Sequence, residues 1–186
     1  MTTESYASTP GKRIPNNRLP LLVHRNAIPG GGVEAVKTCF KNNGWSNNWD
    51  YPGVYTYAHF HSTTHECLGC ARGWMEFKLS IGPDGWTRLR VTAGDVIVMP
   101  AGVSHEDVGH SDDNIMCGGY PGGRDWDNIQ PEFLSQDLYL QACKRIMALP
   151  IPDKDPVSGE ALHHWLDAPS STENWNEWRD SLDRTS

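Results

Sequence analysis

Two glycine-bounded segments constrain the fold of this chain most strongly, because each combines strand-forming residues with side chains that bind metals. The first segment covers residues 53–73 and the second covers residues 94–105. Together they contain four candidate metal ligands: His59, His61, Glu66 and His105. Neutral imidazoles with one carboxylate suit a divalent transition metal such as Fe(II), Mn, Zn, Ni or Cu. We therefore expect one such ion as the cofactor.

The spacing within the first segment predicts that its ligands face the same way. His59 and His61 are two residues apart, and alternate side chains of a strand project from one face. The surrounding residues favour a strand: Val54, Tyr55, Tyr57 and Phe60. The polar run Ser62-Thr-Thr can reverse the chain, and Glu66 then begins a returning strand. One hairpin would thus bring two imidazoles and a carboxylate together.

The second segment predicts a buried strand followed by a tight turn. Residues 95–99 are rich in Val, Ile and Met, and Pro100 and Gly102 provide turn chemistry. Such a turn can direct His105 towards the interior of a barrel.

The remaining histidines and one cysteine have simpler interpretations. Four histidines are interpreted as ordinary core or surface residues: His24, His110, His163 and His164. His65 should face away from Glu66, and it is the first substitute if Glu66 or His59 does not bind metal. Cys70 shares strand parity with Glu66, so it either lines the same interior or packs in the core.

The two segments resemble the motifs of the cupin family. The first motif, G-x5-H-x-H-x3,4-E-x6-G, is matched at Gly53, His59, His61, Glu66 and Gly73. The second motif, G-x5-P-x-G-x2-H-x3-N, is matched at Gly94, Pro100, Gly102 and His105, with Gly109 in place of its last residue. The resemblance implies a mainly β protein: a cupin double-stranded β-helix, or jelly-roll barrel, with flanking α-helices.

Within the cupins, the chain resembles the single-domain YjlB-like group. The features that carry this resemblance are Pro15-Asn-Asn, the run from His61 to Glu66, and Gly119-Tyr-Pro-Gly-Gly. Cupins also imply a homodimer, since dimers through sheet edges are frequent among them.

Composition narrows the function classes. The chain has 186 residues, which suits one domain, and a net charge of −7 with 16 scattered Lys and Arg. We expect no nucleic-acid binding, because there is no basic patch. We expect no membrane association or signal peptide, because no apolar stretch fits either. Five cysteines without a regular framework favour a cytoplasmic location.

The pattern along the chain predicts the order of the elements. Residues 1–14 are interpreted as a flexible arm, and residues 15–186 as one cupin domain with its β core at about 53–120. A first strand is expected at residues 19–28. One helix face before the core carries Val33, Val36 and Phe40.

A helical C-terminal extension is expected at about 131–186. Its first helix begins at Pro131 and has an apolar stripe: Leu134, Leu138, Ala142, Ile146 and Leu149. Trp165 is interpreted as a docking anchor. A last helix with Trp175, Trp178 and Leu182 on one face packs either on its own barrel or on a partner subunit.

The predicted site suits a metal-dependent enzyme with a small organic substrate, anionic or phenolic. Strand parity places Tyr55 and Tyr57 beside His59, where they either bind substrate and act as acids or fill the barrel wall. The resemblance favours a dioxygenase-type oxidoreductase. A metal-dependent isomerase or lyase, a non-catalytic small-molecule binder and a purely structural metal remain alternatives.

Overall fold

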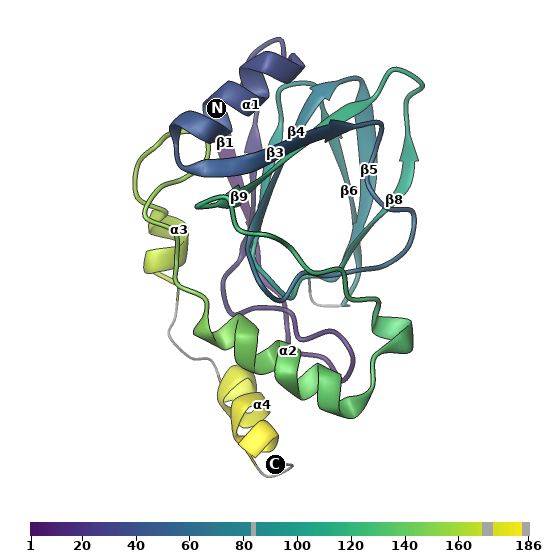
Figure 1. Ribbon diagram of the computed structural model, residues 1–186, viewed down its shortest axis with the longest axis vertical. Coiled ribbons are helices and arrows are strands. Elements are labelled where there is room, and N and C mark those ends of the chain that lie inside the picture. The colour runs from purple at the N-terminus through teal and green to yellow at the C-terminus, as the bar shows by residue number, and fades with distance from the viewer. Residues whose placement is uncertain (83–84, 169–172, 184–186) are drawn as a thin grey trace.

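Two antiparallel sheets form the body of the protein (Figure 1). The computed structural model describes residues 1–82, 85–168 and 173–183. The larger sheet has the order β1-β2-β7-β4-β9-β3. Its strands are β1 (Thr2–Tyr6), β2 (Leu21–Arg25), β3 (Trp45–Tyr51), β4 (Glu66–Arg72), β7 (Val96–Met99) and β9 (Ile115–Pro121). The smaller sheet has the order β6-β5-β8, with β5 (Trp74–Leu79), β6 (Thr87–Thr92) and β8 (His105–His110). The predicted mainly β fold with flanking helices is confirmed.

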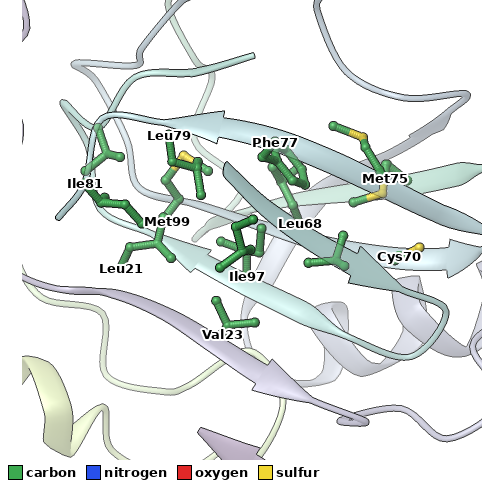
Figure 2. Close-up of a cluster of buried hydrophobic side chains, with 14 residues drawn as sticks. Leu21, Val23, Leu68, Cys70, Met75, Phe77, Leu79, Ile81, Ile97 and Met99 are labelled. Carbon is green, nitrogen blue, oxygen red and sulfur yellow. The ribbon is translucent and has the colours of Figure 1, made fainter. Parts of the chain in front are cut away.

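The apolar core lies between the two sheets (Figure 2). In β5 the side chains alternate, so Met75 and Phe77 are fully buried while Glu76 is half-buried. They meet Leu68 of β4 and Ile97 of β7 from the opposite sheet. Cys70 belongs to this same cluster, and burial raises the pKa of its thiol to about 12. Of its two interpretations, core packing is therefore the one that the structure supports.

The helix α1 (Val33–Asn42) covers the outer face of the larger sheet. Val36 and Phe40 are fully buried there, as the periodicity predicted. Gly69 of β4 permits the close approach, since a Cβ on it would lie 2.5 Å from Cγ1 of Val36. Trp165 of α3 (His163–Leu166) is fully buried in the same cluster, and its Nε1–H donates to the Pro20 carbonyl at 2.8 Å. Its predicted role as a docking anchor is confirmed.

Two of the C-terminal helices lie together at one end of the barrel (Figure 1). A short 3-10 turn, η1 (Pro131–Phe133), precedes α2 (Gln136–Ala148), so the helix begins later than predicted. The Ser135 hydroxyl caps it by accepting from the Leu138 N–H at 3.3 Å. Leu138 itself is 50% exposed, contrary to the predicted stripe, and Tyr139 and Cys143 are buried in its place.

The last helix packs on its own subunit, which was one of the two interpretations. In α4 (Glu173–Asp183), Leu182 is buried against Tyr139 and Cys143 of α2. The Trp178 Nε1–H donates to the Tyr139 hydroxyl at 2.9 Å. No helix in the described part of the chain is long and apolar enough to cross a membrane.

Three predicted elements need correction. Residues 1–14 are not a flexible arm throughout, because residues 2–6 form β1 and pair with β2 along the sheet edge. The sheet also extends beyond residues 53–120, since β3 precedes them and pairs with β9. Both strands are polar edge strands, so neither has the apolar pattern that marks a buried strand.

The third correction concerns the predicted hairpin. The chain around His59 forms only isolated bridges, from His59 to His105 and from Phe60 to Ile129. Glu66 does begin β4, but this strand pairs with β7 and β9 instead of the preceding segment. The His59 and His105 segments therefore meet through a non-local pairing that the sequence spacing does not reveal.

Candidate metal centre

Three histidine side chains converge inside the barrel. His59, His61 and His105 are all buried, and their ligand atoms lie within 4.8 Å of one another. The backbones of His59 and His105 exchange two hydrogen bonds, of 3.2 and 2.9 Å, which hold the two segments side by side. Gly102, with φ of 91°, lies in the turn that leads into His105. This cluster could hold a metal ion.

Each imidazole has its Nδ1 beside a backbone carbonyl. His59 Nδ1 lies 3.1 Å from the Tyr57 oxygen, and His105 Nδ1 lies 3.3 Å from the Val103 oxygen. His61 Nδ1 bonds to the Asp127 oxygen. Since a carbonyl only accepts, each neutral ring carries its proton on Nδ1 and leaves the Nε2 lone pair free. This tautomer is the one that binds a metal through Nε2.

Glu66 places a carboxylate against two of these rings. Its Oε2 lies 3.4 Å from the Nε2 atoms of both His61 and His105, but it has no hydrogen-bond partner. Its other oxygen, Oε1, accepts from the Tyr120 hydroxyl at 2.8 Å. A fully buried carboxylate oxygen without a donor is costly, and a bound cation would remove that cost. The donor set of three imidazoles and one carboxylate thus fits a divalent transition metal.

The electrostatics of the cluster favour an ionised Glu66 and a neutral His59, but not a neutral His61. Burial lowers the pKa of His61, and the facing Glu66 carboxylate outweighs burial and raises that pKa, so a metal ion would have to displace the His61 proton. Burial alone would raise the pKa of Glu66, but the facing His61 and His105 outweigh it and hold that pKa well below the ordinary value. Burial and the neighbouring imidazoles lower the pKa of His59 to about 2. The carboxylate is therefore ionised and the His59 ring neutral at physiological pH.

The two tyrosines singled out from the sequence lie near the cluster, on a loop and not on a strand. Tyr55 is 46% exposed, and its ring is 4.9 Å from that of His59 in an edge-on contact. Tyr57 stacks on Tyr55 at 5.0 Å, and its hydroxyl accepts from the Asn128 amide at 3.0 Å. His65 lies apart from the cluster, where its ring packs 4.8 Å from that of Trp165.

Several residues that support the site were not identified from the sequence. Trp49 donates through Nε1 to the Tyr120 hydroxyl at 2.8 Å, which completes a chain from Trp49 through Tyr120 to Glu66. Asp127 accepts from His61 with its carbonyl and from the Ser62 N–H with its carboxylate. Tyr120 directly follows the glycine pair at the end of the core, and this position was the one feature of the sequence that marked it. Asp127 has none.

A cavity of about 380 Å³ opens beside the cluster. Its lining includes all four candidate ligands together with an aromatic set: Trp49, Tyr51, Tyr55, Tyr120 and Trp126. A small molecule in this cavity would therefore reach the metal ligands directly.

A double-sheet β barrel with converging interior histidines defines the chain as a cupin of the metal-binding type. No protein-family model matches the sequence. The uncharacterized protein YjlB of Bacillus subtilis (strain 168) is 34% identical over 160 residues, which span 85% of this chain and 92% of that protein. The chain therefore belongs to the YjlB family within the cupin superfamily, as its motifs predicted.

Solved structures also match the chain, at low sequence identity and low TM-score. QdtA, a sugar 3,4-ketoisomerase from Thermoanaerobacterium thermosaccharolyticum solved with TDP, is 16% identical with a TM-score of 0.37, over 56% of this chain and 77% of that one. Acireductone dioxygenase from Bacillus anthracis, with cadmium in its active centre, is 17% identical with a TM-score of 0.34, over 63% and 58%. Oxalate decarboxylase from Bacillus subtilis, which has Mn(II) centres, is 17% identical with a TM-score of 0.34, over 72% and 30%.

Proposed function

We propose that this cupin is a metal-dependent enzyme that acts on a small anionic or phenolic molecule, with a dioxygenase-type oxidation as its reaction. One observation carries the proposal: the orphaned Oε2 of buried Glu66 faces two of the three clustered histidines, beside an open aromatic cavity. A buried carboxylate without a donor is the group that a bound cation would satisfy.

Four side chains would hold the ion: His59, His61, Glu66 and His105. A divalent metal there would supply Lewis-acid or redox chemistry, with a local net charge of about +1 that favours an anionic oxygen. The carbonyls of Tyr57, Val103 and Asp127 keep each imidazole in the tautomer that presents Nε2. Tyr120 holds the Glu66 carboxylate through Oε1, so that Oε2 stays directed at the histidines.

The tyrosine loop would act on the substrate. Tyr55 lines the cavity, and we propose that its hydroxyl donates a hydrogen bond to bound substrate. Tyr57 stacks on Tyr55, and we assign it the role of holding that ring in place, with direct acid catalysis as the alternative. The walls are largely aromatic, so a bound ring would displace water from the cavity and strengthen the electrostatic interactions inside it.

Metal analysis and oxygen uptake test the proposal. The chain purified from cells should contain about one transition-metal ion per subunit, and His61→Ala should lose it. His164→Ala is the matched control, since His164 is an exposed histidine in α3. Thermal unfolding by circular dichroism checks that both variants fold.

The substrate assay separates the candidate reactions. With catechol-type and carboxylate substrates, wild type and His164→Ala should consume oxygen while His61→Ala should not. Identical oxygen uptake in all three proteins would dismiss metal-centred oxygenation. Substrate conversion without oxygen uptake would instead identify an isomerase or lyase, and ligand binding without conversion would identify a binding protein. A homodimer remains a prediction that light scattering can test.

A further inference from the structure

We infer that the cavity selects a planar aromatic substrate with one singly charged oxygen group, a carboxylate or a phenolate, and that Trp126 provides the surface on which the ring stacks. This inference rests on the proposed function, because the ionised oxygen would be directed at the histidine cluster. It goes further by naming the substrate class and the residue that discriminates it.

The walls of the cavity are aromatic. The ring of Trp126 lies parallel to that of Tyr120, with centroids 4.7 Å apart and an interplanar angle of 13°. Trp126 is 37% exposed, so part of its surface remains uncovered beside the cavity. Tyr55 and Trp49 add further aromatic rings to the lining. A volume of about 380 Å³ is at the small end of ligand pockets, and it suits one ring or a fused pair.

The charges around the cavity argue against polyanionic ligands. Among its described lining residues, the acidic groups are Asp50 and Glu66, and there is no lysine or arginine. Lys37 neutralises Asp50 at 2.8 Å but does not line the cavity. Phosphates and dicarboxylates are normally held by arginine or lysine. A sugar phosphate or a dicarboxylate would therefore enter without a counter-charge for its second negative group.

The segment that carries Trp126 is tied to the histidine cluster. The adjacent residue, Asp127, accepts through its carboxylate from the Ser62 N–H at 2.6 Å and the Thr63 N–H at 3.2 Å. Its carbonyl accepts from His61. Arg145 braces the same junction, with Nε donating to the Ser62 hydroxyl at 2.8 Å. Trp126 is thus held in a defined position relative to the proposed ligands, and a preorganised wall loses less entropy when a ring binds.

Matched pairs of small probes test the inference by calorimetric titration of the metal-loaded protein. Benzoate and cyclohexanecarboxylate carry the same single charge but differ in aromaticity. Benzoate should bind more tightly, roughly two- to tenfold, which is the range expected for one aromatic stacking contact. Phenyl phosphate carries the same ring with a larger charge, and it should bind more weakly than benzoate.

Variants assign the discrimination to single residues. Trp126→Ala should abolish the preference for benzoate over cyclohexanecarboxylate, and Trp126→Phe should retain most of it. Trp86→Ala is the matched control, since Trp86 is 39% exposed but does not line the cavity. Tyr51, which is 65% exposed, lines the cavity, so Tyr51→Arg should improve the binding of phenyl phosphate.

The outcomes distinguish this inference from the proposed function. Equal binding of benzoate and cyclohexanecarboxylate, or an unchanged preference in Trp126→Ala, overturns the inference. The inference is also overturned if the metal-loaded, active protein prefers phenyl phosphate to benzoate, but the proposed function would then stand. A protein that binds no metal but still prefers benzoate through Trp126 supports the selection by the cavity and overturns the proposed function.

Discussion

The hydrogen-bond chain behind Glu66 gives the sharpest prediction. The hydroxyl of Tyr120 lies between two groups, accepting from Trp49 Nε1–H and donating to Glu66 Oε1, each at 2.8 Å. Tyr120 is 1% exposed, so water cannot readily replace its hydroxyl. Tyr120→Phe keeps the ring and removes only this oxygen. We expect the variant to fold and to bind metal more weakly.

The magnitude follows from the two bonds that are lost. A partner that orients a metal ligand contributes roughly 10- to 100-fold to metal affinity, so releasing the carboxylate should weaken metal binding by about that factor. The indole N–H of Trp49 also loses its acceptor. An unsatisfied buried donor costs about 1–3 kcal/mol, and half-buried Trp49 should fall at the lower end. The metal-free variant also loses the bond to the charged Glu66, worth about 1.5–3 kcal/mol, so the two losses together should make it about 2.5–4 kcal/mol less stable to unfolding.

Two measurements separate these effects. Competition with a chromophoric chelator gives the metal affinity, and urea denaturation of the metal-free protein gives the free energy of unfolding. Tyr6→Phe is a matched control, because Tyr6 donates to Glu4 at 2.7 Å on β1, at the edge of the larger sheet. If Tyr120→Phe keeps its affinity within about twofold, or if Tyr6→Phe weakens metal binding equally, the reasoning that a hydroxyl donor orients the ligand is refuted.

Three further predictions concern stability and packing. Burial raises the pKa of Asp155, but the hydrogen bond from His24 at 2.8 Å outweighs it and leaves that pKa below its ordinary value. The stabilisation is therefore present above the unfolded-state pKa of about 3.9 and is lost as the pH falls through the lower folded-state pKa. In Asp155→Asn, the free energy of unfolding should consequently fall less steeply towards acid pH, as measured by urea titrations between pH 7 and pH 3. Trp165→Ala should lower the free energy of unfolding by about 3–5 kcal/mol, measured in urea, because this ring is fully buried. Gly118→Ala should displace the Trp49 indole, which would lie 2.1 Å from the new Cβ, and the displacement should change the near-ultraviolet circular dichroism and weaken metal binding.

The histidine cluster could be predicted from the sequence, but the backbone that forms it could not. The residue types and their spacing indicated a convergence of His59, His61 and His105, and their ligand atoms do converge. The predicted hairpin was wrong, because the segment before His61 pairs with distant parts of the chain. His59 pairs with His105, which lies 46 positions further along, and Phe60 pairs with Ile129, which lies 69 positions further along. Local propensity carries no information on such distant partners, whereas motif spacing reflects the final geometry.

Most of the errors in the predicted fold concern polar edge strands. Apolar alternation identified β5, because one of its faces is buried between the sheets. The strand β1 is held instead by backbone pairing with β2 and by an ion pair from Arg25 to Glu4 at 2.9 Å. An edge strand need not bury a full face, so a run of Thr, Glu and Ser was interpreted as an arm. For the same reason, β3 was not predicted from the sequence.

Some of the groups that orient the proposed ligands can be predicted from the sequence, and others cannot. Asp127 holds His61 with a backbone carbonyl, which any residue could provide at that position. Its residue type is required by a different contact, since its carboxylate accepts from the N–H groups of Ser62 and Thr63. The position of the carbonyl therefore depends on the side chain of the same residue. A search for metal ligands would not find Asp127, because its side chain contacts the backbone one and two residues after His61 and not the imidazole itself.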